Sequence, residues 1–197
     1  NLKGESEYDI PIVMQSPVYS KDGKNAVLEI RSQDNKHRWI VQLDLVSGKI
    51  TELDHQHADA WIGGPGIPNY SFGGGTLGFI DNATFYFQSE ATGFSHLYIY
   101  DLKTKKKEAL TTGNWEVREV KLSNDKKSFY IITTTTHPGY RSFYKLDIAS
   151  KKMTGILTND GNYEVEVSPD EKILLVRYSY KNKPWELYVG ANKPNSN

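Results

Sequence analysis

The sequence predicts an all-β fold, namely a β-propeller fragment of about four blades with four antiparallel strands each. Tyr, Phe and Trp make up 12% of the 197 residues, and these residue types favour half-buried strands. A turn that leads into an apolar run recurs along the chain, which is typical of a repeat architecture. No window shows an apolar stripe at helical spacing, so we expect almost no helix.

The first repeated feature is a turn rich in Asp, Asn and Pro. Asp and Asn side chains bond to the nearby backbone, and Pro presets a turn dihedral. Asp81, Asp125 and Asp170 are separated by 44 and 45 positions, within the range of roughly 40 to 50 residues for a propeller blade. The turns lie at residues 16–23, 80–82, 122–125 and 167–171, and the apolar runs that follow begin at Ala26, Thr84, Phe129 and Ile173.

The second repeated feature is a strand that ends in a polar turn. Alternation along such strands has a period of two, so that Val165 and Val167 fall on one face and Glu164 and Glu166 on the other. Copies lie at residues 39–44, 97–101, 143–147 and 187–189, and further β-runs follow the first three at residues 50–53, 108–111 and 154–158. Each unit is therefore expected to form a small sheet with one apolar face.

The repeat divides the chain into a lead-in at residues 1–15, a partial propeller at 16–191 and a linker at 192–197. The interval from Asp22 to Asp81 is longer than the others, at 59 positions. The excess falls in a glycine-rich stretch, which predicts an irregular insertion at residues 63–76. The predicted blade units lie near residues 16–62, 77–121, 122–166 and 167–191.

Charge and cysteine content exclude several function classes. The chain has 24 basic residues, 24 acidic residues and no cysteine. Balanced charge gives no general attraction to nucleic acid or to an anionic membrane. The absence of Cys excludes disulfides, thiolate zinc sites and cysteine nucleophiles. No run approaches the ~18 apolar residues of a membrane span. From the charge balance we expect no nucleic-acid partner, and from the lack of a long apolar run we expect no membrane segment.

Catalytic motifs are absent from the sequence. No G-x-S-x-G elbow occurs, because Ser95 follows Gly93 but is itself followed by His96 and Leu97. No phosphate loop or dinucleotide fingerprint occurs either. We therefore predict no catalytic residue, no metal and no cofactor in this chain.

The histidines and tryptophans allow more than one interpretation. His55, His57 and Asp59 would share a face of a strand and are of the types that bind zinc or iron, but we prefer a polar loop. For His96 we expect a ring nitrogen that bonds to the neighbouring turn. We expect the tryptophans Trp61 and Trp115 to be packing anchors between blades, with aromatic stacking on a ligand as the alternative.

Two strings in register resemble a known family. Residues 89–98, S-E-A-T-G-F-S-H-L-Y, resemble the S-E-x-x-G-x-x-H-L-Y segment of dipeptidyl peptidase IV-like enzymes, and residues 110–117 resemble their L-T-x-G-x-W-x-V. The strand at residues 143–146 is similar to the family's x-L-Y-K-I, and residues 60–63 resemble its G-W-V segment. The resemblance extends from about Ser16 to Tyr188.

This resemblance implies the later blades of the eight-bladed propeller of a serine exopeptidase, periplasmic or secreted, placed before an α/β-hydrolase domain. The family's acidic pair for the substrate N-terminus would lie upstream and its catalytic triad downstream, so the chain alone carries neither. The propeller would gate access to the hydrolase domain and shape its substrate cavity. The candidate cavity-facing residues are Gly64, Pro65, Tyr70 and Phe72.

The alternative interpretation is a non-enzymatic propeller scaffold that binds a protein partner. The expected partners under the first interpretation are the hydrolase domain of the parent chain and, through it, a peptide substrate. We also expect self-association. A partial ring leaves its end units without neighbours, so aromatic side chains such as Trp39 and Tyr188 would be exposed to solvent.

Overall fold

Sixteen β-strands, and no helix, make up the regular structure of the residues that the computed structural model describes, 11–68 and 75–196. The all-β prediction is therefore confirmed. The chain divides into two compact units, one formed by residues 1–93 and 97–109 and the other by residues 94–96 and 110–197. The described residues contain no long apolar helix of the kind that crosses a membrane.

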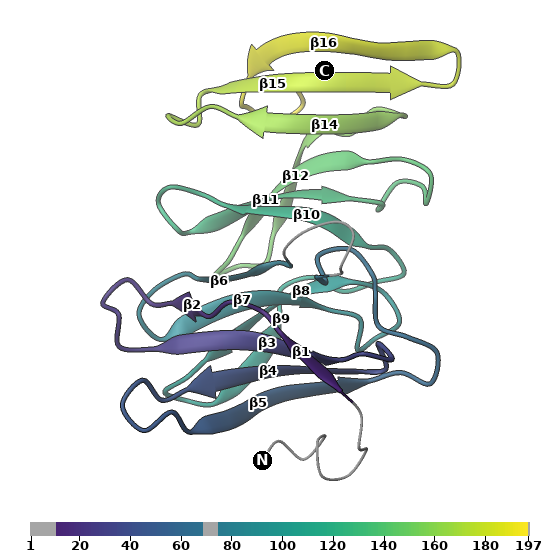
Figure 1. Cartoon of the computed structure of the whole chain (residues 1–197). Helices are drawn as coiled ribbons and strands as arrows, with labels where there is room; N and C mark the ends of the chain where they lie inside the picture. Colours follow the sequence, from purple (N-terminus) through teal and green to yellow (C-terminus); the bar gives the residue numbers. More distant parts are fainter. Residues whose placement is uncertain (1–10, 69–74, 197) are drawn as a thin grey trace. The chain divides into compact units, whose positions relative to one another are not determined.

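The first unit contains two antiparallel sheets (Figure 1). The first sheet has the order β1-β3-β4-β5, with β2 paired to β3. Its strands are β1 (Ile12–Met14), β2 (Val18–Tyr19), β3 (Ala26–Ser32), β4 (His37–Leu43) and β5 (Ile50–His57). The second sheet runs in sequence order through β6 (Leu77–Phe79), β7 (Thr84–Ser89), β8 (His96–Asp101) and β9 (Lys106–Ala109).

The apolar faces of these two sheets form a shared core. Val27 and Ile40 of the first sheet pack with Phe85 and Tyr100 of the second. The rings of Phe85 and Tyr100 stack with centroids 5.3 Å apart, one of the offset arrangements that aromatic pairs prefer. Phe85 and Phe87 of β7, and Tyr98 and Tyr100 of β8, are two positions apart, so the period-two pattern places each pair on one face of the sheet.

The second unit repeats this arrangement with two further antiparallel sheets. The first is formed by β10 (Val117–Leu122), β11 (Ser128–Thr133), β12 (Ser142–Asp147) and β13 (Met153–Leu157). The second has three strands, β14 (Asn162–Val167), β15 (Ile173–Tyr180) and β16 (Lys183–Ala191). Tyr130 and Phe143 of the former pack with Tyr163 and Leu174 of the latter.

The sheets divide the chain at places different from the predicted unit boundaries. Hydrogen bonding assigns residues 117–122 and 162–167 to the sheets that follow them, whereas the prediction closed units at 121 and 166. Two of the predicted boundaries therefore fall beside or within strands of the following sheet, because a repeat shows how often a strand recurs but not with which strand it pairs. In the same way β1, within the predicted lead-in, pairs with β3.

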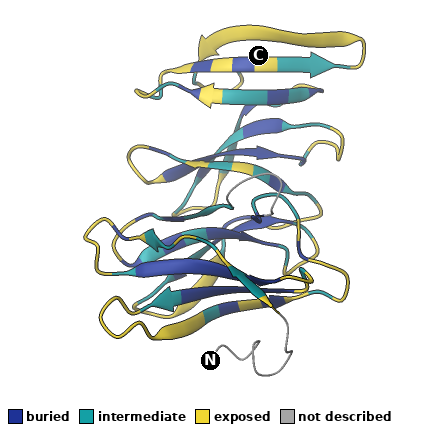
Figure 2. Ribbon diagram, viewed as in Figure 1, coloured by how far each residue is buried: buried dark blue, intermediate teal, exposed yellow. Residues whose placement is uncertain are grey.

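Burial differs between the first and last sheets. Figure 2 shows β3 buried along its length and β16 exposed along its length. Tyr188 is 41% exposed, as expected, but Trp39 is only 1% exposed, so the expectation that it is open to solvent was wrong. Trp39 is buried because it packs with Leu28, Ile30 and Val41 on one face of the first sheet.

Candidate functional site

The candidate site begins where β5 ends, at His57. The chain then leaves the sheet as an irregular segment, residues 58–68, that contains Gly63, Gly64 and Gly66. Within this segment, two buried isoleucines, Ile62 and Ile67, each 4% exposed, enclose the glycines. Gly66 has φ +73°, a left-handed backbone conformation that L side chains rarely adopt. We refer to residues 62–67 as the cavity segment.

Two polar side chains at the end of β7 hold the cavity segment. The Glu90 carboxylate accepts a hydrogen bond from the backbone N–H of Gly63, with Oε2 3.1 Å from the nitrogen. The Gln88 amide donates to the carbonyl of Pro65 at 3.2 Å and accepts from the Thr76 hydroxyl at 2.6 Å. The N–H of Thr76 in turn donates to the Gly66 carbonyl at 2.8 Å.

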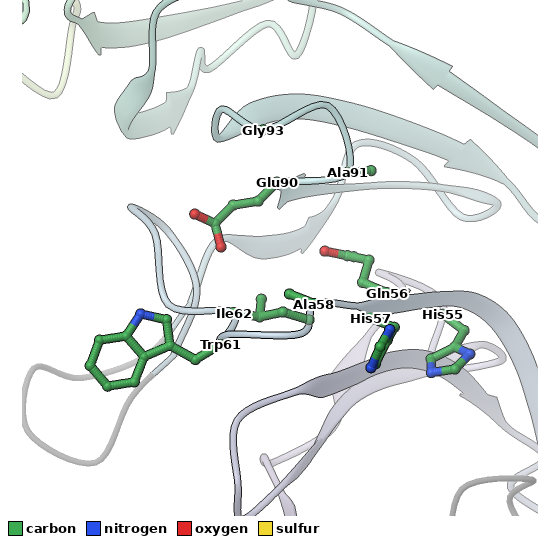
Figure 3. Close-up of a pocket in the computed structure, with 9 residues that line it drawn as sticks. All are labelled: His55, Gln56, His57, Ala58, Trp61, Ile62, Glu90, Ala91 and Gly93. Atoms are coloured by element: carbon green, nitrogen blue, oxygen red, sulfur yellow. The ribbon is translucent and has the colours of Figure 1, made fainter.

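A pocket of about 430 Å³ lies beside this segment. Figure 3 shows Glu90 reaching toward the residues that follow β5, with Ala58 and Ile62 lining the same space. The ring of Trp61 lies on the side away from the histidines and is 74% exposed. The residues that line the pocket are His55, Gln56, His57, Ala58, Trp61, Ile62, Glu90, Ala91 and Gly93. A carboxylate, imidazoles and an indole around a concave surface can interact with a polar or basic group of a ligand.

The predicted site residues fall in this region only in part. Gly64 and Pro65 belong to the cavity segment, and both are half-buried. Tyr70 and Phe72 lie outside the described residues. Trp61, expected as a packing anchor, is instead exposed at the pocket, because the segment that carries it leaves the sheet. Trp115 is only partly buried.

His55 and His57, at the end of β5, belong to an aromatic cluster. They do not form a metal-binding group with Asp59, the alternative that their spacing allowed. Within residues 11–68 and 75–196, no group of three or more His, Asp or Glu side chains is placed to hold a metal ion. His55 and His57 lie instead beside His37 and Trp39 of β4. The His37 Nδ1 and His55 Nε2 atoms are 3.0 Å apart, and the Trp39 and His55 rings stack at 5.0 Å.

His96 occupies the structural position expected for it. The side chain is 1% exposed, and both ring nitrogens have partners. Nδ1 lies 3.0 Å from the Thr111 hydroxyl and Nε2 lies 2.9 Å from the Gly113 carbonyl. The Trp115 ring meets the imidazole edge-on at 5.0 Å. His96 of the H-L-Y string therefore contacts Gly113 and Trp115 of the G-x-W string.

A buried ion pair behind the pocket was missed by sequence reasoning. Arg38 on β4 and Glu29 on β3 are 0% and 1% exposed, with Nη2 and Oε2 2.6 Å apart. Arg38 also donates from Nη1 to the backbone carbonyl of Gln88 at 2.5 Å. The available signal was a charged residue within an apolar run, because Glu29 interrupts Ala26 to Ile30. Buried charges require such pairing.

The four successive antiparallel sheets, with five, four, four and three strands, define this chain as a β-propeller fragment. A family model for the dipeptidyl peptidase IV N-terminal region matches residues 7–185. The chain therefore belongs to the dipeptidyl peptidase IV N-terminal region family. The motifs at residues 89–98 and 110–117 had indicated this family from the sequence.

Individual relatives agree with the family assignment. The chain is 29% identical over 164 residues to dipeptidyl peptidase 4 of Trichophyton rubrum, covering 80% of this chain and 20% of that protein. It is 34% identical over 110 residues to dipeptidyl peptidase 4 of Arthroderma otae, covering 53% and 14% respectively. The chain thus spans about a fifth of the length of the first of these.

A solved structure shows the same fold. The crystal structure of Porphyromonas gingivalis dipeptidyl peptidase 4 superposes with a TM-score of 0.74 and 17% sequence identity. The match covers 93% of this chain and 26% of that one. At this identity the likeness concerns the fold alone.

Proposed function

We propose that this chain is the C-terminal half of the propeller of a serine-type dipeptidyl peptidase, which gates access to an α/β-hydrolase domain and shapes its substrate cavity. The cavity segment supplies part of the cavity wall. The observation that carries the proposal is the pinned, glycine-rich segment beside an open pocket, in a chain whose family is that of dipeptidyl peptidase IV propellers.

The physical role is selection by size and fit. A rigid propeller wall restricts which peptides reach the hydrolase domain, and preorganised wall groups orient those that enter. The chemistry would belong to the hydrolase domain, since no nucleophile elbow occurs in this sequence. By family resemblance the parent enzyme would act in the periplasm or outside the cell.

The test compares the isolated chain with the parent protein on Ala-Pro and Gly-Pro chromogenic dipeptides. We expect turnover by the parent and none by the chain alone. The parent should also release a dipeptide from a short peptide but not from a folded protein with the same N-terminus. Turnover by the purified chain, or a parent sequence without G-x-S-x-G, would overturn the proposal and favour a non-enzymatic scaffold.

A further inference from the structure

We infer that Gln88 and Glu90 are positioning residues for the cavity segment, so that the shape of the proposed cavity wall is set by β7 rather than by the glycines themselves. The inference rests on the proposed function only in assigning the segment to a substrate cavity. The contacts themselves are independent of it. Neither side chain touches a reacting group.

The cavity segment has little conformational preference of its own. Three of its six residues are glycines, which lose more backbone freedom on folding than any other residue. One hydrogen bond within residues 62–67 runs from the Ile67 N–H to the Gly64 carbonyl, at 3.2 Å, whereas the Ile62 N–H and the Gly66 carbonyl bond to residues outside this range. A single conformation therefore depends on contacts from outside the segment.

Glu90 supplies the first of these contacts. Its carboxylate accepts from Gly63 N–H, a charge-assisted bond of the stronger kind. The same carboxylate fills the space beside Gly64, where an added methyl group would overlap with Oε1 and Cδ. The backbone of Gly64 and the side chain of Glu90 are thus packed against each other.

Gln88 supplies the second contact and connects it to the interior. Its side chain binds Pro65 and Thr76 on both sides of residues 69–74, and it is 0% exposed. Its own carbonyl accepts from Arg38, the member of the buried ion pair with Glu29. The segment is therefore tied through one residue to the most buried charges of the sheet.

Neighbouring glycines provide a matched pair of variants. A methyl group at Gly64 would displace the Glu90 carboxylate, whereas a methyl group at Gly63 has no atom within 4 Å. Gly64→Ala should therefore release the segment and Gly63→Ala should not. Because Gly64→Ala acts by displacing Glu90, it should add little in a Glu90→Ala background, and the double-mutant cycle should be strongly non-additive. Glu90→Gln keeps one acceptor oxygen and should restore most of the protection.

The experiment measures amide hydrogen exchange of residues 62–67 in this chain, together with KM and kcat for an Ala-Pro substrate in the parent enzyme. Loss of one charge-assisted bond predicts exchange about tenfold faster at Gly63 for Glu90→Ala and for Gly64→Ala. KM should rise about three- to tenfold with kcat nearly unchanged, because the lost contact would stabilise bound substrate and transition state equally. The thermal midpoint should move little, which separates positioning from unfolding.

The outcomes separate the two claims. Unchanged exchange in Glu90→Ala, or additive effects in the cycle, would overturn the positioning role. Faster exchange with an unchanged KM would support the positioning role and overturn the assignment of the segment to the substrate cavity. A kcat loss equal to the loss of kcat/KM would also count against positioning of bound substrate.

Discussion

At the scale of single residues, the most demanding feature is the ion pair of Glu29 and Arg38. Both side chains are almost fully excluded from solvent, and one oxygen of Glu29 and the Nε of Arg38 have no hydrogen-bond partner. Removing one member leaves a buried, uncompensated charge. Glu29→Ala should therefore lower the free energy of unfolding by about 3–5 kcal/mol, measured by urea denaturation.

The matched control is the exposed pair of Arg177 and Glu164, whose atoms are 2.7 Å apart. Solvent screens this pair, so Arg177→Ala should cost no more than about 1 kcal/mol. Equal effects of the two variants would show that burial of the first pair does not govern its contribution.

Tyr163 provides a pH-dependent test. Burial, together with the neighbouring Tyr178, raises the pKa of Tyr163 to about 12. The unfolded chain releases this proton near pH 10, so the folded state holds it more tightly. The resulting stabilisation is complete below pH 10 and is lost as the pH rises from 10 through 12.

Tyr163→Phe should remove this loss of stability at alkaline pH. The free energy of unfolding of the variant should therefore fall less steeply between pH 9.5 and 12 than that of the wild type. Ultraviolet titration should show one fewer tyrosine that ionises well above pH 10 in the variant. Identical alkaline curves for the two proteins would contradict the assignment.

At the scale of elements, the turns before β3, β11 and β15 share one hydrogen-bonding pattern. In the turn between β10 and β11 the Ser123 hydroxyl donates to Asp125 at 2.7 Å, and the Ser128 N–H donates back to the Ser123 oxygen at 3.0 Å. The same pattern recurs at Ser20 and Ser168. The Ser123 hydrogen bond also lowers the pKa of Asp125.

Ser123→Ala should lower the free energy of unfolding by about 1–2 kcal/mol, because it leaves a buried N–H without its acceptor. The equivalent bond, from the Ile173 N–H to the Ser168 oxygen, is exposed, so Ser168→Ala should cost less. Thermal denaturation of both variants tests this, and a larger loss for Ser168→Ala would refute it.

The outermost strand of the last sheet should be the least stable element. All nine residues of β16 are exposed, whereas all six residues of β11 are buried. Unprotected edge backbone opens at low free energy. Hydrogen exchange should therefore label residues 183–191 well before residues 128–133, and equal protection of the two strands would contradict the observed burial.

At the scale of the whole molecule, the outer face of the last sheet predicts association. Leu187 and Val189 are 64% and 71% exposed, beside Leu175 at 43% and Trp185 at 43%. Exposed apolar strands next to an open edge favour pairing with another chain. Sedimentation should show concentration-dependent self-association, reduced by Leu187→Lys. A monomer at all concentrations would disprove this.

The repeat period, the strand chemistry and two short strings were enough to predict the fold class and the family. Period-two alternation depends only on the chain itself, so the faces of strands such as β14 were readable from the sequence. The irregular segment that holds Gly64 and Pro65 was readable in the same way, because a run of glycines marks such a segment wherever it lies, but its role in a substrate cavity stays a prediction.

Tertiary structure alone decided what surrounds each side chain. Pairing assigned β10 and β14 to the sheets that follow them, placed His37 beside His55, and brought Gln88 and Glu90 onto a segment more than twenty residues earlier. The same pairing buried Arg38 with Glu29 and left Trp61 exposed. Contacts between residues distant in sequence depend on which strands become neighbours, and the composition of a strand does not specify its partner.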